Sequence, residues 1–180
     1  RFDTLPHATG ADRASMLERK SRQYYRSTRF VSTLFLNRAA GRRSDDRYLF
    51  SALTNPSLVE PWLAAIAAHG APVAGVYLAP MLTKGILQRL KLTQPRVLIV
   101  APHRSGLRLT FYKNGVFTSS RLTRDIPQDP GDAARMLVTE LSNTRLYLST
   151  LRLDEIDEPL DVVFLDRHNR LDSIAAQINA

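Results

Sequence analysis

The clearest alternation of apolar and polar residues lies between residues 106 and 127, in the stretch GLRLTFYKNGVFTSSRLTRDIP. Such alternation is typical of half-buried strands. Asn114 and Gly115 separate its two runs, and this pair favours a tight type I′ turn because both central residues need φ > 0. The stretch therefore predicts a two-stranded hairpin.

The remaining pattern after residue 95 predicts three more elements and a closing helix. The run RVLIVAP, at 96–102, is typical of a buried strand. Residues 129–153 place apolar side chains three and four positions apart, which indicates a long helix with Asp129 as its N-cap. Residues 159–167 predict a strand, and SIAAQIN predicts the last helix. The predicted order is β-β-β-α-β-α with a mixed sheet.

The first half of the chain has weaker patterns. A helix is expected from Ala14 to about Phe30, and RFVSTLFLNR predicts a short strand before a polar loop at 39–47. RYLFSAL, TNPSLVEPWLAAIAAHG and PVAGVYLAP then predict a strand, a helix and a second strand at 72–80, which is a βαβ crossover. MLTKGILQRLKL predicts another helix. We expect three parts: a basic helix and loop at 1–46, the βαβ unit at 47–94, and a final subdomain at 95–180.

The element order and local sequence of residues 47–167 resemble a known family. The β-β-β-α-β-α order is similar to the ribonuclease-H-like subdomain. ALTNPSLVEPWLAAIAAHGAPVAGVYLAPMLTKGIL, followed by LRLTFYKNGVFTSSRLTRDIP and a helix, resembles the cytoplasmic assembly proteins of type IV pilus and type II secretion systems. The resemblance implies an α/β fold of the actin-like ATPase type. It also implies partners such as a pilus or secretion ATPase and membrane-anchored assembly proteins.

Composition narrows the possible chemistry. The chain has no Cys, which excludes disulfides, thiolate zinc sites and cysteine nucleophiles. No apolar run approaches the roughly 20 residues that span a bilayer. The chain starts at Arg1 without a Met, so we expect it to be a piece of a longer protein. Its expected location is the cytoplasm, with any tether to the inner membrane outside this sequence.

Positive charge is concentrated at the start of the chain. The net charge is +8, and residues 1–47 hold 11 Arg and Lys against 5 Asp and Glu, which is +6. In ERKSRQYYRSTRF, basic residues alternate with aromatic ones, a composition that suits a protein interface or, alternatively, single-stranded nucleic acid. A protein partner is the favoured reading, and its candidate contacts are Arg22, Tyr25 and Arg26.

A possible nucleotide site lies where the first strand of the final subdomain turns back. Actin-like ATPases grip phosphates at such turns, where an Asp places the metal. The corresponding residues are His103, Arg104, Ser105 and Gly106, and the turn contains no carboxylate. Magnesium-dependent hydrolysis therefore lacks an anchor. The strand at 96–102 also lacks the acidic residue that a two-metal nuclease needs. We expect no cofactor, with ATP and Mg²⁺ as the alternative.

The hairpin supplies the other candidate contact surface. A plain two-residue turn places Tyr112 opposite Phe117, and Arg108 opposite Arg121, on one face. Two opposed arginines favour an anionic group between them. The preferred hypothesis is a non-catalytic interaction module of a pilus or secretion assembly. Its expected partners are other proteins of that assembly, with a homodimer as a further alternative. The alternatives are a nucleotide-binding ATPase lobe and a nucleic-acid-binding domain.

Overall fold

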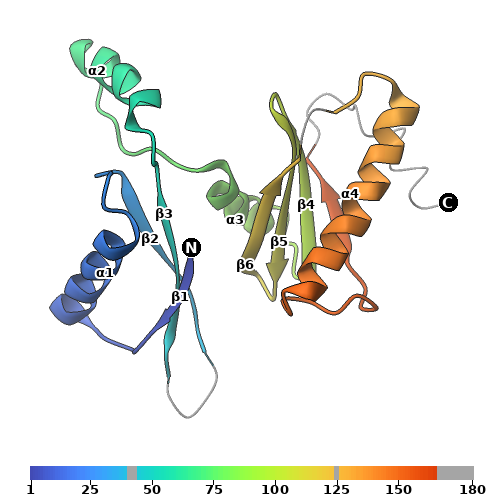
Figure 1. Cartoon of the computed structure of the whole chain (residues 1–180), viewed down its shortest axis with the longest axis horizontal. Helices are drawn as coiled ribbons and strands as arrows, with labels where there is room; N and C mark the ends of the chain where they lie inside the picture. The colour runs from blue at the N-terminus through green and yellow to red at the C-terminus, as the bar shows by residue number, and fades with distance from the viewer. Residues whose placement is uncertain (40–43, 124–125, 166–180) are drawn as a thin grey trace. The chain divides into compact units, whose positions relative to one another are not determined.

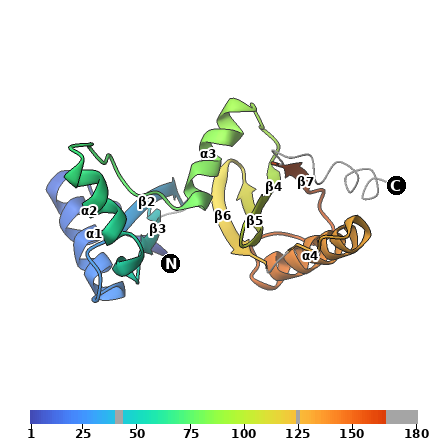
Figure 2. The same ribbon diagram turned by 90° about the horizontal axis from the view of Figure 1, so that it is seen from above.

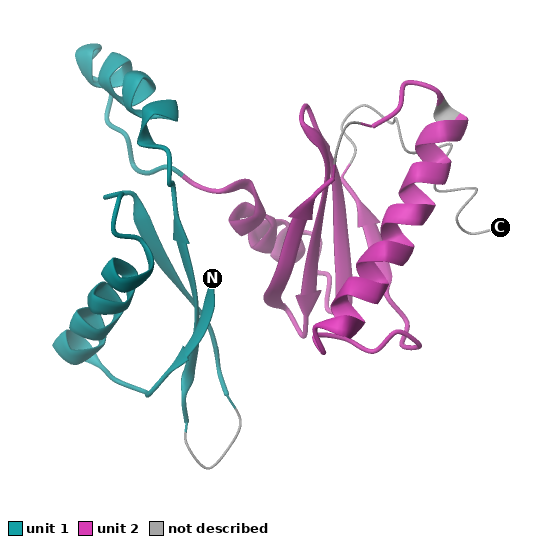
Figure 3. Cartoon of the chain, viewed as in Figure 1, with its two compact units in different colours: residues 1–76 teal, residues 77–180 magenta. Residues whose placement is uncertain are grey.

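The computed structural model describes residues 1–39, 44–123 and 126–165. The chain divides into two compact units, residues 1–76 and residues 77–180 (Figure 3). This division differs from the three parts expected from the sequence. The first expected boundary, after residue 46, falls inside a strand that runs from Asp46 to Ala52.

Unit 1 is a three-stranded antiparallel sheet with one helix on a single face (Figure 1). The strand order is β1-β3-β2. Tyr48 and Phe50 of the central strand pack with Leu5 against apolar side chains of the helix. The helix ends six residues earlier than predicted, and the expected extended entry contains a strand. The bounds are β1 Phe2–Leu5, α1 Gly10–Tyr24, β2 Val31–Arg38 and β3 Asp46–Ala52.

The rest of unit 1 departs from the predicted βαβ crossover. The short helix η1 (Pro56–Leu58) and α2 (Glu60–Ala68) occupy the expected helical stretch. The strand predicted at 72–80 is wrong, because residues 71–78 have no regular secondary structure and are exposed. Pro72 and Pro80 lack an N–H donor, and no described strand pairs with this segment. An apolar run becomes a strand only where a neighbouring strand satisfies its backbone.

Unit 2 has the predicted β-β-β-α-β arrangement. Its sheet has the order β6-β5-β4-β7, in which β7 is parallel to β4 and the other neighbours are antiparallel. The helix predicted at the end of the chain lies outside the described residues. The bounds are α3 Ala79–Arg89, β4 Arg96–His103, β5 Gly106–Lys113, β6 Val116–Leu122, α4 Pro130–Thr150 and β7 Asp161–Phe164.

Helices cover both faces of this sheet (Figure 2). Leu137 and Leu148 of α4 form the main core with alternate residues of β4 and β5, among them Leu98 and Phe111. On the other face, Thr83 of α3 shares a 2.7 Å hydrogen bond with the Tyr112 hydroxyl of β5. The start of α4 is as predicted, since the Asp129 carboxylate accepts from the Asp132 N–H at 2.9 Å.

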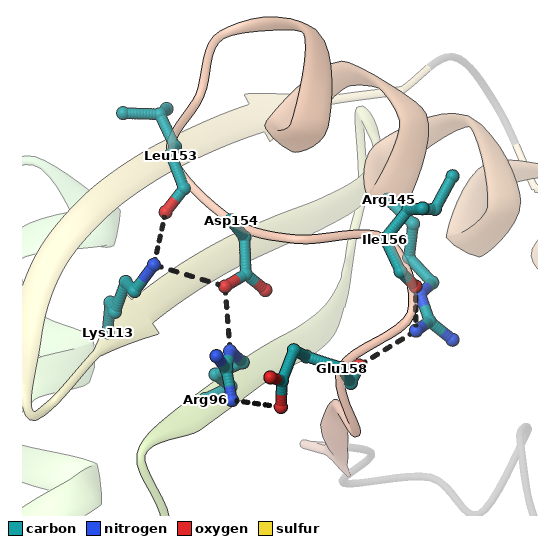
Figure 4. A network of polar contacts seen from close by, with 7 residues as sticks. All are labelled: Arg96, Lys113, Arg145, Leu153, Asp154, Ile156 and Glu158. Atoms are coloured by element: carbon teal, nitrogen blue, oxygen red, sulfur yellow. Dashed lines mark hydrogen bonds and ion pairs between the residues drawn. The ribbon is translucent and has the colours of Figure 1, made fainter.

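A network of ion pairs and hydrogen bonds holds the connection between α4 and β7 against the sheet and α4 (Figure 4). Arg96 Nε donates to Asp154 Oδ1 at 2.8 Å, and Lys113 Nζ lies 3.4 Å from the same oxygen. Arg96 also reaches Glu158 at 3.1 Å. Arg145 donates to the backbone oxygens of Ile156 and Glu158. The connection is thus tied to β4, β5 and α4 at once.

Candidate partner-binding site

A β-bulge separates the two arginines of the hairpin. Tyr112 lies opposite Phe117 as predicted, but the register shifts at the next position, so that Arg108 lies opposite Leu122 and Arg121 opposite Leu109. The predicted Arg108–Arg121 pair is therefore wrong. Because side chains alternate between faces, one extra residue moves every later side chain of the strand to the other face.

The aromatic pair of the hairpin belongs to the core. Tyr112 and Phe117 are both buried, and their rings meet edge to face with centroids 5.8 Å apart. Burial raises the pKa of Tyr112, and the hydrogen bond with Thr83 opposes that rise. These side chains are interior packing under α3. They do not form the accessible surface that the alternation suggested.

The two arginines have different surroundings within unit 2. Arg121 Nη2 donates to Glu140 Oε2 of α4 at 2.6 Å, so its charge is neutralised inside the unit. Arg108 lies on the opposite face, where its Nη1 is 3.4 Å from the Ser120 hydroxyl. Its buried Nε has no hydrogen-bond partner among the residues that the structure describes. Contact of either arginine with a partner stays a prediction.

The basic helix contributes anchors as well as exposed cations. The Tyr25 hydroxyl donates to the Phe50 backbone oxygen at 3.1 Å, and the Tyr25 side chain packs against the unit 1 core. It fixes the end of α1. Arg22 pairs with Glu18 at 2.6 Å on the exposed helix face, and Arg26 is exposed just beyond the helix. Partner binding by these three residues stays a prediction.

The predicted anion-binding turn joins β4 to β5. His103 pairs with Gly106 across the turn, with Arg104 and Ser105 at its tip. The first three side chains are exposed, while Gly106 is buried with φ 126°, a conformation that favours glycine. Anion binding here stays a prediction. In the part of the chain that the structure describes, no three His, Asp or Glu side chains gather as metal ligands would.

One surface that the sequence reasoning missed lies on η1 and α2. Leu58, Trp62 and Ile66 are spaced by four residues, and the first two are 63% and 73% exposed. No residue of α2 is buried. A helix as apolar as EPWLAAIAA is normally buried. The sequence predicted a helix here within a βαβ crossover, and the structure shows that helix without a buried residue. We name Leu58, Trp62 and Ile66 the α2 surface.

A second feature that was missed is a charged cluster where β2 ends and β3 begins, beside the loop that connects them. The Asp46 carboxylate is buried, accepts from Arg38 Nε at 2.8 Å and lies 2.9 Å from His7 Nδ1. Hydrogen bonds from Arg38 and His7 lower the pKa of Asp46 to about 2. His7 is 39 residues from Asp46 in the sequence and is brought to it only by the fold.

The described helices include none that combines the length and apolar character needed to cross a bilayer. Comparison with models of known protein families finds no match, and no curated protein matches the sequence.

The fold itself has relatives among solved structures. A chain of a PilM-PilN type IV pilus biogenesis complex superposes with a TM-score of 0.68 over 99% of this chain, at 14% sequence identity. The actin-like, ribonuclease-H-like fold expected from the sequence is confirmed. A Bacteroides thetaiotaomicron protein with an actin-like ATPase fold and unknown function aligns over the same share, at 6% identity. Its TM-score of 0.42 is too low to establish a shared fold.

The chain spans about three fifths of the length of each matched structure, 62% and 61%.

Proposed function

We propose that this protein is a non-catalytic interaction module that docks another protein of a pilus or type II secretion assembly. The observation that carries the proposal is the α2 surface, where an apolar helix has no buried residue. Exposed apolar patches of this kind commonly mark protein contacts. The fold shared with a chain of a pilus biogenesis complex points to the same class of function.

The anatomy of the α2 surface fits a contact that other protein atoms cover. Trp62 lies at its centre, one helical turn from Leu58 and one from Ile66, and buried tryptophans are among the side chains that contribute most to binding. Glu60 pairs with Arg29 at 3.0 Å beside the patch, which leaves a polar rim. We place the module in the cytoplasm, where the assembly proteins it resembles act.

Catalysis is not part of the proposal. The turn at 103–106 holds no carboxylate that would place a magnesium ion. In the nucleic-acid alternative Tyr24, Tyr25 and Phe30 would stack on bases, and the first two pack against the core of unit 1. Nucleotide binding and nucleic-acid binding therefore have less support than a protein contact.

Photo-crosslinking in cells that express this protein together with its assembly tests the proposal. A photoreactive amino acid at position 62 should give a covalent adduct with a second assembly protein. The matched control is the same amino acid at Thr139, an exposed position on α4, and it should give none. No adduct at position 62, or the same adducts from both positions, would reject the proposal.

A further inference from the structure

We propose that the outer edge of β2 binds an extended, acidic segment of another protein, which adds as a fourth strand to the sheet of unit 1. The inference rests on the proposed function, because it names the chemistry of a partner. It uses a set of residues different from the α2 surface.

Backbone geometry shows that β2 has an open edge. Among the described strands, the order β1-β3-β2 leaves one side of β2 without a neighbour. Phe50 N donates to Arg1 O at 2.8 Å, so the backbone groups of Phe50 point away from β2. Phe50 and Thr33, which lie opposite each other, therefore form a non-hydrogen-bonded pair. In such a pair the N–H and C=O of Thr33 point away from β3, toward the open edge. The same alternation turns Phe35 outward.

These outward groups have no backbone partner in the described parts of the chain. An unpaired edge accepts a strand from another chain unless something blocks it. Strand addition of this kind obtains affinity from backbone hydrogen bonds and specificity from alternate side chains. The edge at Thr33 and Phe35 therefore meets the backbone requirement for strand addition.

Side chains along this edge supply an apolar contact. Val31, Thr33 and Phe35 alternate onto the face that α1 covers, and Val31 and Phe35 are 39% and 40% exposed. The Phe35 ring meets the buried Tyr48 ring edge to face, with centroids 5.7 Å apart, which fixes its position. A strand beside β2 would cover both exposed side chains.

The charge around this edge determines what the partner segment should contain. The Arg13 guanidinium lies 5.8 Å from the centre of the Phe35 ring, is exposed, and has no ion pair among the described residues. Arg38 ends the strand with its side chain half exposed, although Asp46 binds it. Residues 1–47 carry a net charge of +6. Carboxylates in the added strand would complement these cations.

The same charges disfavour a second copy of this chain at the edge. Antiparallel pairing of two β2 strands about Thr33 would place Arg38 of one copy close to Arg29 of the other. Like charges across a strand pair are destabilising. An acidic segment from a different protein avoids this repulsion.

Amide hydrogen exchange on the full chain tests the inference. The probe is a synthetic peptide of sequence EVEVEVEVE. At saturation the amides of Thr33 and Phe35 should exchange at least about tenfold more slowly, because strand pairing protects outward N–H groups. Two control peptides separate the contributions. One is N-methylated at every residue so that neither of its edges can donate a backbone hydrogen bond, and the other has Lys in place of Glu. Neither control should bind.

Charge variants of the protein complete the test. Arg13→Gln should weaken peptide binding by about two- to fivefold, the range for one exposed ion pair. Arg19→Gln, an exposed arginine elsewhere on α1, should change binding little. The inference is overturned by equal binding of the N-methylated peptide, by unchanged exchange at Thr33 and Phe35, or by no binding. If exchange at Thr33 and Phe35 slows without peptide as the protein concentration rises, the edge is occupied by a second copy of the chain, and the inference is overturned.

The two proposals fail independently. A cross-link from position 62 without peptide binding at β2 would keep the proposed function and remove this inference. If the peptide protects the β2 amides but position 62 gives no cross-link, the β2 inference stands and the α2 surface is not the docking site.

Discussion

Thr118 is the residue that decides where the arginines of the hairpin point. It is the extra residue of the bulge, between Phe117 opposite Tyr112 and Ser119 opposite Phe111. The Asn114-Gly115 turn was predictable because it has a residue signature, and both residues have the expected positive φ. The bulge has no such signature, so the alternation predicted the wrong face for Arg121.

The buried hydrogen bond between the Thr83 and Tyr112 hydroxyls leads to a prediction about stability. Tyr112→Phe should lower the free energy of unfolding by about 1 kcal/mol, because the Thr83 hydroxyl loses a buried partner. Urea unfolding measures it. Tyr147→Phe, which removes an exposed hydroxyl, is the control and should have little effect. Equal effects of the two changes would contradict the assigned hydrogen bond.

Asp46 supports a prediction about pH. Its pKa falls from the ordinary 3.8 to about 2 on folding, so its ionised form stabilises the fold above about pH 4, and that contribution disappears as the pH falls toward 2. The difference in the free energy of unfolding between the wild type and Asp46→Asn should therefore become smaller as the pH falls from about 4 to about 2. Urea unfolding at several pH values measures it. A difference that stays constant from pH 6 to pH 2 would show that the carboxylate is not held as described.

Among the elements, helix α4 and the strands of unit 2 agree with the sequence, whereas the strand expected at 72–80 does not. Helix α4 has its N-cap at Asp129 and Pro at its first position, and it begins as predicted. The segment at 72–80 has the composition of a buried strand but no strand beside it. The α2 surface was missed for a related reason, because an apolar helix pattern predicts burial without saying which atoms cover it.

Asp129 supports an element-scale prediction. Asp129→Ala should destabilise unit 2 by about 1 kcal/mol, because the Asp132 N–H loses its acceptor at the helix start. Thermal unfolding followed by circular dichroism measures the change. Asp157→Ala, in the exposed connection after α4, is the matched control. If both variants unfold alike, the cap does not stabilise the helix.

The connection between α4 and β7 supports a comparison of two carboxylates. Asp154→Asn should speed amide exchange in residues 151–160 more than Glu158→Gln does. The Asp154 side chain is nearly buried and pairs with both Arg96 and Lys113, whereas the Glu158 side chain is 43% exposed and pairs with Arg96. Exposed ion pairs contribute little. Faster exchange in the Glu158 variant would contradict the network as described.

For the molecule as a whole, the sequence predicted the order of elements in unit 2 but not the three-stranded sheet of unit 1. The order of strands and helices in unit 2 reproduces the ribonuclease-H-like topology, because each element there carries its own periodicity. On the hairpin, Tyr112 and Phe117 are buried and Arg121 pairs with Glu140, whereas contact of Arg108 with a partner stays a prediction. Leu58, Trp62 and Ile66 are exposed on the stretch that the sequence predicted only as the helix of a βαβ crossover.

The most direct test of the central claim uses Trp62, which is the only tryptophan of the chain. In the isolated protein its emission should be that of an exposed indole and should be quenched readily by iodide. When the assembly protein captured from position 62 is added, the emission should shift to shorter wavelength and quenching should fall. A complex in which Trp62 keeps the spectrum and quenching of the free chain would contradict the account.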